Sequence, residues 1–385
     1  MTDDTRLRDG LGPREDPQAA SVAEGSGTAV EPAGGSRADA AHRDGSHPYG
    51  AHSDGSHPEG GHGHDGVYAA IDLGTNNCRL LIARPTGDGF RVIDSFSRII
   101  RLGEGMSASG RISEAAIGRA ISALSVCSEK IHARRAKRLR LVATEACRAA
   151  DNADDFLDRV AHATGIRLEV IDRETEARLA VVGCSPLLDP HGRGAILFDI
   201  GGGSSELVWI ERDPAKPELA PRIRAWMSIP LGVVTLAERF GGKVVSDETY
   251  AAMVEAVAIH VGPFAARIGG DLAGMHLLGT SGTVTTLAGL HLDLTRYDRR
   301  RVDGIWLSDA ELTETIAKLH GMSYHDRASN NCIGVERADL VLAGCAILDA
   351  IRTAFPLPRL RVADRGLREG MLVEMMRQDG ALGPA

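Results

Sequence analysis

The pattern of apolar and polar positions divides the 385 residues into a polar N-terminal segment and a long region of alternating strands and helices. Residues 1–66 hold almost no large apolar side chains, and apolar runs begin at Val67. Short apolar runs predict strands, whereas apolar residues three or four positions apart predict helices. The predicted strands cover 67–73, 78–84, 90–101, 139–144, 166–171, 195–200, 205–211, 222–229, 274–278 and 359–362. The predicted helices cover 113–133, 153–164, 173–183, 233–240 and 247–267, with another from Thr283 and mostly helical sequence after it.

The N-terminal segment 1–66 is predicted to be a disordered tail, because it cannot bury enough apolar surface to offset the entropy of ordering. Within it DGSHP occurs twice, at 44–48 and 54–58. Histidines recur every five residues from His42 to His62, followed by His64. Such a tract can bind transition metals. The simpler interpretation is a low-complexity repeat whose metal affinity is incidental.

Net charge, the length of apolar runs and the cysteine pattern each narrow the range of partners and locations expected for this protein. The formal net charge is −8, and residues 1–66 hold twelve Asp and Glu against five Arg, so the rest is nearly neutral. This argues against a duplex nucleic-acid partner. No uninterrupted apolar run approaches the ~20 residues that cross a bilayer, so no membrane partner is expected. The six scattered cysteines and the lack of an apolar leader predict reduced thiols and a cytoplasmic location.

One pattern occurs twice, about one domain length apart. Residues 71–75 (IDLGT) and 198–202 (FDIGG) both read apolar, Asp, apolar, Gly, small, and each joins two predicted strands. We therefore expect two similar α/β halves facing each other across a cleft. The predicted boundaries are a tail at 1–66, a first domain at 67–183 and a second domain at 184–385.

The two Asp-Gly turns suit phosphate and a metal ion. A turn without Cβ atoms lets backbone N–H groups approach phosphate oxygens closely, and an Asp at the end of a strand offers an oxygen to Mg²⁺. A Gly-rich turn that merely reverses the chain is the simpler alternative, but two matching turns favour phosphate. The segment 277–283 (LLGTSGT) follows a strand and opens a helix, which suits an anion at a helix N-terminus.

These segments resemble one family. AAIDLGTNNCRLLIA, LFDIGGGSSELVWI and LLGTSGTVTTLAG, in this order, are similar to the exopolyphosphatase/guanosine pentaphosphate phosphohydrolase (Ppx/GppA) family. ATEACRAADNADDF, ETEARL and ADRGLREGML extend the resemblance over about 67–378. The resemblance implies two RNase H-like domains of the actin-like/sugar-kinase superfamily. It also implies hydrolysis of terminal phosphate from polyphosphate or guanosine pentaphosphate, with Mg²⁺ or another divalent cation.

The resemblance also implies a set of site residues. Glu176, in the E-A-R segment, matches the family's base for water, although Arg173 and Thr175 depart from the common pattern beside it. The expected metal-binding residues are Asp72, Asp199 and Glu206. The expected phosphate-binding residues are Gly74, Thr75, Asn76, Arg148, Gly201, Gly202, Gly203, Ser204, Ser205, Gly279, Ser281 and Gly282.

Three functions remain open from the sequence. The leading one is the metal-dependent hydrolase, and the others are an ATP-dependent phosphotransferase of the same superfamily and a non-enzymatic sensor of guanosine tetraphosphate or polyphosphate. Basic runs at 134–140 and 296–301 are equally compatible with a polyanion track and with a solvated surface. A homodimer is possible, but the sequence does not determine the oligomeric state.

Overall fold

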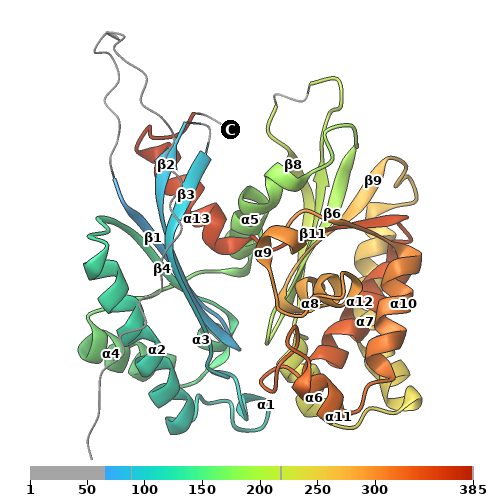
Figure 1. Cartoon of the computed structure of the whole chain (residues 1–385), viewed down its shortest axis with the longest axis horizontal. Coiled ribbons are helices and arrows are strands. Elements are labelled where there is room, and N and C mark those ends of the chain that lie inside the picture. Colours follow the sequence, from blue (N-terminus) through green and yellow to red (C-terminus); the bar gives the residue numbers. More distant parts are fainter. Residues whose placement is uncertain (1–65, 88, 217–218, 384–385) are drawn as a thin grey trace, which may run out of the picture. The chain divides into compact units, whose positions relative to one another are not determined.

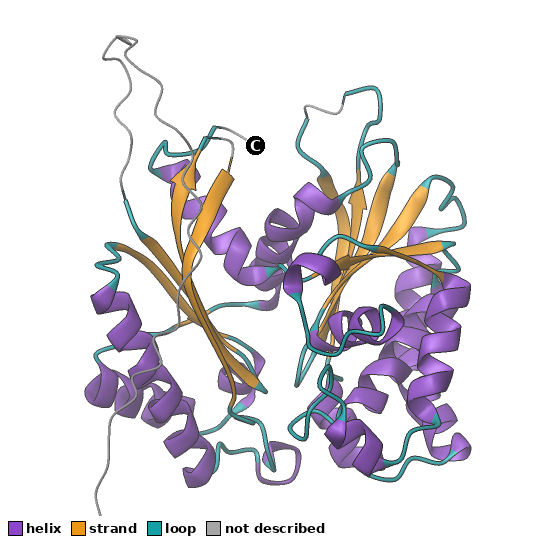
Figure 2. Ribbon diagram, in the orientation of Figure 1, coloured by secondary structure: helices purple, strands orange, loops and turns teal. Residues whose placement is uncertain are grey.

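The computed structural model describes residues 66–87, 89–216 and 219–383, so the predicted disorder of the tail lies outside the described residues. The described chain forms two β-sheets with helices on both faces of each (Figure 2). The prediction of an α/β fold with two sheet-based halves is therefore confirmed. The two sheets share one strand order. In each sheet, the strand that comes first in the sequence pairs with its hairpin partner on one side and with a parallel strand on the other.

The first sheet has the order β3-β2-β1-β4-β5. Its strands are β1 (Tyr68–Leu73), β2 (Asn77–Thr86), β3 (Gly89–Ile99), β4 (Arg138–Ala143) and β5 (Glu169–Val170). Alternate residues of β1 point to opposite faces, so Ile71 packs with α2 (Glu114–Ala133) and α4 (Ala153–Thr164), whereas Ala70 packs on the other side. Helix α2 begins behind Ser113, whose side chain accepts a hydrogen bond from the Ala116 amide, as the sequence predicts.

The second sheet has the order β10-β11-β9-β6-β7-β8 and repeats the first with one extra strand. Its strands are β6 (Gly194–Ile200), β7 (Ser205–Glu211), β8 (Arg222–Ile229), β9 (Met275–Thr280), β10 (Trp306–Ser308) and β11 (Arg359–Ala363). One face packs on a helical layer, which forms the larger apolar core. That layer includes α6 (Val233–Phe240), α7 (Asp247–Ile268), α8 (Gly282–His291), α10 (Asp309–His320) and α12 (Val341–Ala354). The other face packs on α5 (Arg173–Cys184).

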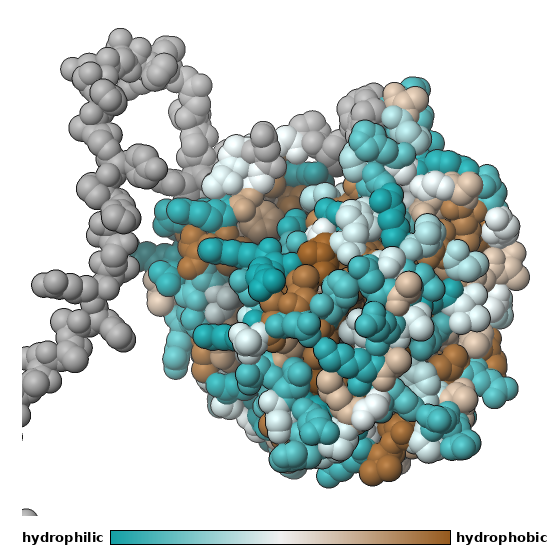
Figure 3. Space-filling view, turned by 45° about the vertical axis from the view of Figure 1, so that its right-hand side comes forward, coloured by the Kyte–Doolittle hydropathy of each residue, from teal (hydrophilic) through white to brown (hydrophobic). Residues whose placement is uncertain are grey.

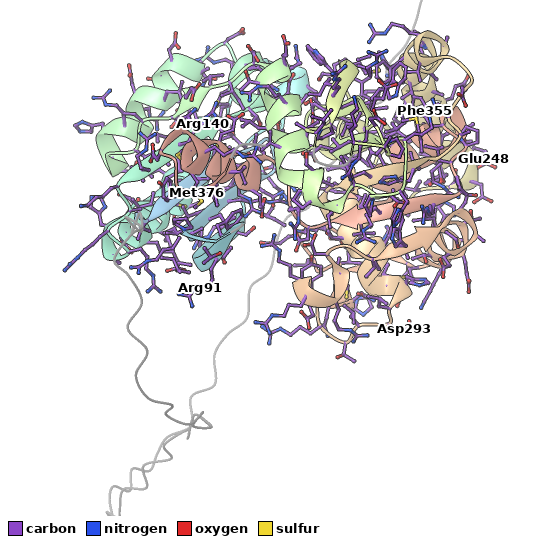
Figure 4. All side chains as sticks on the ribbon, turned by 90° about the horizontal axis from the view of Figure 1, so that it is seen from above. Arg91, Arg140, Glu248, Asp293, Phe355 and Met376 are labelled. Atoms are coloured by element: carbon purple, nitrogen blue, oxygen red, sulfur yellow. The ribbon has the colours of Figure 1, made fainter. Side chains whose placement is uncertain are left out.

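Helices α5 and α13 (Leu367–Gln378) lie side by side between the two sheets (Figure 1). A Cβ at Gly370 would lie 2.0 Å from the Leu179 carbonyl oxygen, so the two helices touch backbone to backbone. Helix α13 comes from the end of the chain but covers the first sheet, where Arg140 of β4 donates to Glu374 at 2.9 Å. Figure 4 shows Arg140 and Met376 on this half, and Phe355 on the other.

Two strand predictions differ from the structure, and one short strand was not predicted. β5 holds only two residues, because Ile166 and Leu168 pack into the first core instead of pairing along β4. β9 continues to Thr280, since Gly279 and Thr280 pair with Phe198 and Asp199 of β6. β10 was not predicted, because its three residues carry too short a pattern. The remaining short elements are α1 (Met106–Ser109), α3 (Glu145–Ala149), η1 (Ser185–Leu187), α9 (Arg299–Val302) and α11 (Tyr324–Ser329).

Helix α7 is the one described helix long and apolar enough, by length and composition, to cross a membrane. Its residues Met253, Val257 and Val261 are fully buried in the second core, where α7 packs against α12. One side of α7 is therefore buried in the second core. The face in Figure 3 is largely hydrophilic, with apolar residues in separate smaller areas. All six cysteines are buried and none forms a disulfide.

Candidate active site

The two Asp-Gly turns meet at the bottom of a cleft between the two sheets. The β1–β2 turn holds residues 74–76 and the β6–β7 turn holds residues 201–204. A Cβ at Gly202 would lie 2.9 Å from the Thr75 Cβ and 3.1 Å from the Asn76 amide nitrogen. Glycines 201–203 do not have positive φ angles, so close approach of the two turns, and not an unusual backbone conformation, explains the three glycines.

Both turns present unpaired backbone amides to the cleft. Among the described residues, the N–H groups of Thr75, Asn76, Gly202 and Gly203 donate to no backbone acceptor. These residues line one pocket, which we call the hairpin chamber. Helix α8 begins at the same chamber with Gly282, where Ser281 caps the helix by accepting a hydrogen bond from the Val284 amide at 3.1 Å. Unpaired amides from two turns and one helix N-terminus therefore converge on a site suited to an anion.

The chamber brings together most of the predicted site residues. Those that line it are Asp72, Gly74, Thr75, Asn76, Glu176, Asp199, Gly201, Gly202, Gly203, Ser204, Glu206, Ser281 and Gly282. Three predicted phosphate-binding residues do not line it: Arg148, Ser205 and Gly279. The Ser205 hydroxyl is buried and donates to the Leu231 carbonyl at 2.8 Å. Gly279 lies inside β9, where the Phe198 ring would be 2.5 Å from a Cβ, so its small size serves packing.

Four carboxyl groups of the chamber have raised pKa values, and for Asp199, Glu206 and Glu176 the charge of a neighbouring carboxylate contributes to the rise. Burial is the largest cause for each, and it raises the pKa of Asp72, of Asp199 to about 7 and of Glu206 to about 7. The pKa of Glu176 is raised to about 8 by burial and by the charge of Glu206. Carboxylates this close ionise together only when a positive charge joins them.

Two buried oxygens of the chamber, Asn76 Oδ1 and Asn77 Oδ1, accept no hydrogen bond from the described residues. Buried acceptors of this kind ordinarily bind water or a cation. Among the described residues, no three acidic, histidine or cysteine side chains are arranged to hold an ion directly. The oxygen donors therefore fit a hydrated or phosphate-bound cation better than one enclosed by protein ligands.

Glu176 lies in the first turn of α5, which begins behind Asp172. The Asp172 side chain accepts a hydrogen bond from the Thr175 amide at 2.7 Å. Arg148 Nη2 forms an ion pair with Glu176 Oε2 at 2.8 Å. Arg148 thus contacts the predicted base itself and not the chamber. Its two other partners, Glu145 and the Ile171 carbonyl, explain this orientation.

A second pocket, the arginine chamber, continues from the hairpin chamber. The two share Asp72, Arg79, Asp199, Ser281, Gly282, Arg337 and Leu367 as lining residues. Arg79, Arg337 and Arg368 line the arginine chamber and have no ion-pair partner among the described residues. The Arg337 guanidinium carbon lies 3.4 Å from a Cβ built at Gly282, beside the positive N-terminus of α8.

Burial lowers the pKa of Arg337 and Arg368, and the charge of Arg79 lowers both further. Positive groups concentrated in this way favour an anion. The sequence analysis did not single out these arginines. Arg79 and Arg368 lie inside family-like segments that it quotes, and Arg337 carries no local signal.

Known proteins with similar sequences belong to the family that the site residues resemble. The sequence model of the Ppx/GppA phosphatase family matches residues 81–379. Exopolyphosphatase 2 of Mycobacterium tuberculosis is 30% identical over 322 residues, which cover 80% of this chain and 98% of the relative. Guanosine-5'-triphosphate,3'-diphosphate pyrophosphatase of Photobacterium profundum is 30% identical over 326 residues, but only 59% of its own length is covered.

Solved structures agree as well. The crystal structure of the Aquifex aeolicus Ppx/GppA family member has a TM-score of 0.67 and 30% identity, covering 82% of this chain and 98% of the other. An exopolyphosphatase structure from Cytophaga hutchinsonii, at 23% identity and a TM-score of 0.74, shares the fold. These matches confirm the predicted family and its class of phosphoanhydride hydrolases. The chain belongs to the Ppx/GppA phosphatase family.

Proposed function

We propose that this chain hydrolyses the terminal phosphoanhydride bond of inorganic polyphosphate, of guanosine pentaphosphate at its 5′ end, or of both. The observation that carries the proposal is the placement of the Glu176 carboxylate, which is ion-paired with Arg148 at 2.8 Å, in a chamber lined by amides that have no backbone partner. A base has to lie within reach of the attacking water, and a phosphoryl group needs donors for its oxygens. One chamber supplies both.

In the proposed reaction, Glu176 takes a proton from water while the water oxygen bonds to the terminal phosphorus. The bond from that phosphorus to the bridging oxygen breaks, and the electron pair leaves with the shortened phosphate chain. The amides of Gly202, Gly203, Thr75 and Asn76 stabilise the negative charge on the phosphoryl oxygens. Little else is required of the protein, because positioning and charge stabilisation account for most phosphoryl-transfer catalysis.

Asp72, Asp199 and Glu206 would hold a divalent cation such as Mg²⁺, with water between some of the oxygens. When bound, the cation supplies positive charge to the phosphate oxygens and to the carboxylates. Glu206 is oriented for such a role, because its Oε1 accepts hydrogen bonds from the Ser204 and Ser228 hydroxyls, both at 2.8 Å. The raised pKa values of Asp199 and Glu206 support a cation at this position.

The arginine chamber supports a substrate with several phosphates. Its unpaired guanidinium groups adjoin the hairpin chamber and are suited to the phosphates behind the terminal one. The first basic run is less suited to this purpose, because Arg134, Arg138 and Arg140 are paired with Asp94, Asp379 and Glu374 at 2.8 to 2.9 Å. In the second run, Arg299 is paired with Glu369.

A direct test is phosphate release from long polyphosphate, short polyphosphate and guanosine pentaphosphate, measured side by side with Mg²⁺. We expect release from at least one of them without any added acceptor. If phosphate leaves only when an acceptor is present, the chain is a phosphotransferase. Tight binding of all three without turnover would instead indicate a sensor, and either result would contradict the proposal.

Without a divalent cation, the melting temperature should fall by a few degrees or more as the pH rises from 6 to 8.5. The pKa values of Asp199, Glu206 and Glu176 in the folded chain are about 7 to 8, above their ordinary values of 3.8 and 4.5. The folded chain therefore holds protons on these three carboxyl groups more tightly than the unfolded chain does. The stability that results is complete below about pH 4 and is lost as the pH rises through about 7 to 8. Mg²⁺ should restore stability at pH 8.5 and change little at pH 6.

Thermal denaturation in chelator and in Mg²⁺, at both pH values, measures this effect. The Asp199→Asn variant serves as the control, because it has one fewer carboxyl group to ionise and should lose less stability at pH 8.5. A wild-type protein whose stabilisation by Mg²⁺ is the same at both pH values would argue against the carboxylate cluster.

A further inference from the structure

We infer that Arg101 is a positioning residue, which holds Arg337 in place from the opposite side of the cleft. The inference rests on the proposed function, because it takes the arginine chamber as the site of the phosphates behind the terminal one. Arg101 follows β3 in the first half of the chain and lines neither chamber. Arg337 lies in the second half, in the segment 335–340 before α12. The sequence analysis assigned Arg101 no role.

The backbone of Arg101 is fixed on the β1–β2 turn of the first sheet. Its amide and the Ile100 amide both donate to the Asn76 carbonyl, at 3.1 and 2.8 Å. From α2, Arg119 donates to the carbonyls of Ile100 and Arg101, at 2.7 and 3.1 Å. Arg101 has a φ of 45°, in the left-handed region that residues other than glycine seldom adopt. Such a conformation persists only where the surroundings hold it, and it is concentrated at functional sites.

The side chain of Arg101 reaches the second half and contacts the segment that carries Arg337. Its Nη1 and Nη2 atoms donate to the two carboxylate oxygens of Asp339, at 3.1 and 3.0 Å. Nη2 also donates to the Glu336 carbonyl at 3.1 Å. The two partners therefore stand immediately before Arg337 and two residues after it. A two-pronged pair of this kind fixes direction as well as distance, so Arg101 holds the segment on both sides of Arg337.

Arg337 depends on this contact because little else fixes its position. Residues 335–340 form turns instead of a helix or strand, and the fully buried side chain of Ala338 anchors them to the second core. Arg337 itself has no ion-pair partner in the described part of the chain. Its guanidinium carbon lies 3.4 Å from a Cβ built at Gly282, at the start of α8. Arg101 thus supplies the contact to the first half that the segment otherwise lacks.

A fixed segment is needed because the charges of the arginine chamber repel each other. Burial and then the charge of Arg79 lower the pKa of Arg337, so the two guanidinium groups are held together against repulsion. A bound polyphosphate would offset that repulsion, but Arg101 holds Arg337 in place before the anion arrives. A site that is already arranged loses less free energy on binding. Loss of Arg101 should therefore weaken substrate binding more than it slows the chemical step.

The test is the Arg101→Met variant, which keeps much of the side-chain length but lacks the guanidinium. It is assayed on long polyphosphate, or on guanosine pentaphosphate if that is what the wild-type protein hydrolyses. We expect KM to rise about 10-fold, in the range of a lost hydrogen bond to a charged group. The value of kcat should change by no more than about threefold, because Glu176 and the two Asp-Gly turns are unaltered.

The matched control is Glu238→Ala, which removes a different contact between the two halves. Glu238, on α6, accepts hydrogen bonds from the Gly105 amide at 2.8 Å and from the Ser107 hydroxyl at 2.5 Å. Its partners lie near Arg101 in the sequence, but none of these residues belongs to the segment 335–340. If Arg101 served only to hold the two halves together, Glu238→Ala would raise KM as well. We expect this variant to have the wild-type KM and kcat.

A double variant shows whether Arg101 acts through Arg337. In an Arg337→Met background there is no guanidinium to hold, so Arg101→Met should raise KM by no more than about a further twofold. An equal rise of KM in both backgrounds would overturn the inference, as would a normal KM in Arg101→Met alone. If thermal denaturation shows that Arg101→Met does not fold, Arg101→Lys keeps the charge and should give a smaller rise in KM that again disappears in Arg337→Met.

Equilibrium binding of polyphosphate separates this inference from the proposed function. If the wild-type protein binds polyphosphate without releasing phosphate, the proposed function fails, and the dissociation constant of Arg101→Met still decides on the positioning role. If phosphate is released but Arg101→Met binds as tightly as the wild-type protein, the proposed function stands and the positioning role is wrong.

Discussion

The Glu176→Gln variant should release phosphate about 10²- to 10⁴-fold more slowly than the wild-type protein, because it cannot accept a proton from water. Glutamine keeps the size and hydrogen-bonding reach of glutamate, so the chamber should keep its shape. Substrate binding should be retained, since the unpaired amides of the two turns and the arginine chamber are unchanged. The measurements are steady-state phosphate release and equilibrium binding of the same substrate.

Glu174→Gln is the matched control for this variant. Glu174 lies two residues earlier on α5 but is exposed and does not line either chamber, so its loss should be mild. A Glu176→Gln protein that turns over at nearly the wild-type rate would mean that the base lies elsewhere. Glu206, the other buried glutamate of the proposed cation site, would then be the next candidate.

The Asp199→Asn variant should lose about 10- to 100-fold in activity and require more Mg²⁺ for half-maximal rate. Asp199 is the penultimate residue of β6 and lines both chambers, and the charges of Glu176 and Asp72 raise its pKa. Asparagine has nearly the same shape but lacks the charge that attracts a cation. Because a buried carboxylate is removed, the variant should fold at least as well as the wild-type protein above pH 7.

The control here is Asp349→Asn, which removes a different buried carboxyl group whose pKa is also raised by burial. Asp349 lies on α12 against Tyr250 and Arg352, outside both chambers, so its variant should keep the normal Mg²⁺ requirement. Unchanged activity and Mg²⁺ dependence in Asp199→Asn would refute the metal and phosphate role of this turn.

The sequence by itself determined the class of fold and the location of the hairpin chamber. Strands and helices repeat with clear apolar periods, so most elements were predicted close to their observed bounds. The two Asp-Gly turns are local features, and a repeated strand–turn–strand pattern places both at the same edge of two similar sheets. Asp72 and Asp199 could therefore be expected near one another, and the family resemblance added Glu176 and Glu206; all four line the hairpin chamber.

Only the tertiary structure decided what the side chains around that chamber contact. Gly202 leaves room for Thr75, which is more than a hundred residues away in the sequence. Gly279 leaves room for the Phe198 ring of a neighbouring strand. Arg148 was predicted to contact phosphate, yet its guanidinium is ion-paired with Glu145 and Glu176. Arg337 joins Arg79 and Arg368 only because three distant segments meet at one chamber. Apolar periodicity is a local property of the sequence and can be detected in a short segment. Ion pairs and close backbone contacts form between segments that folding brings together, so no local pattern specifies them.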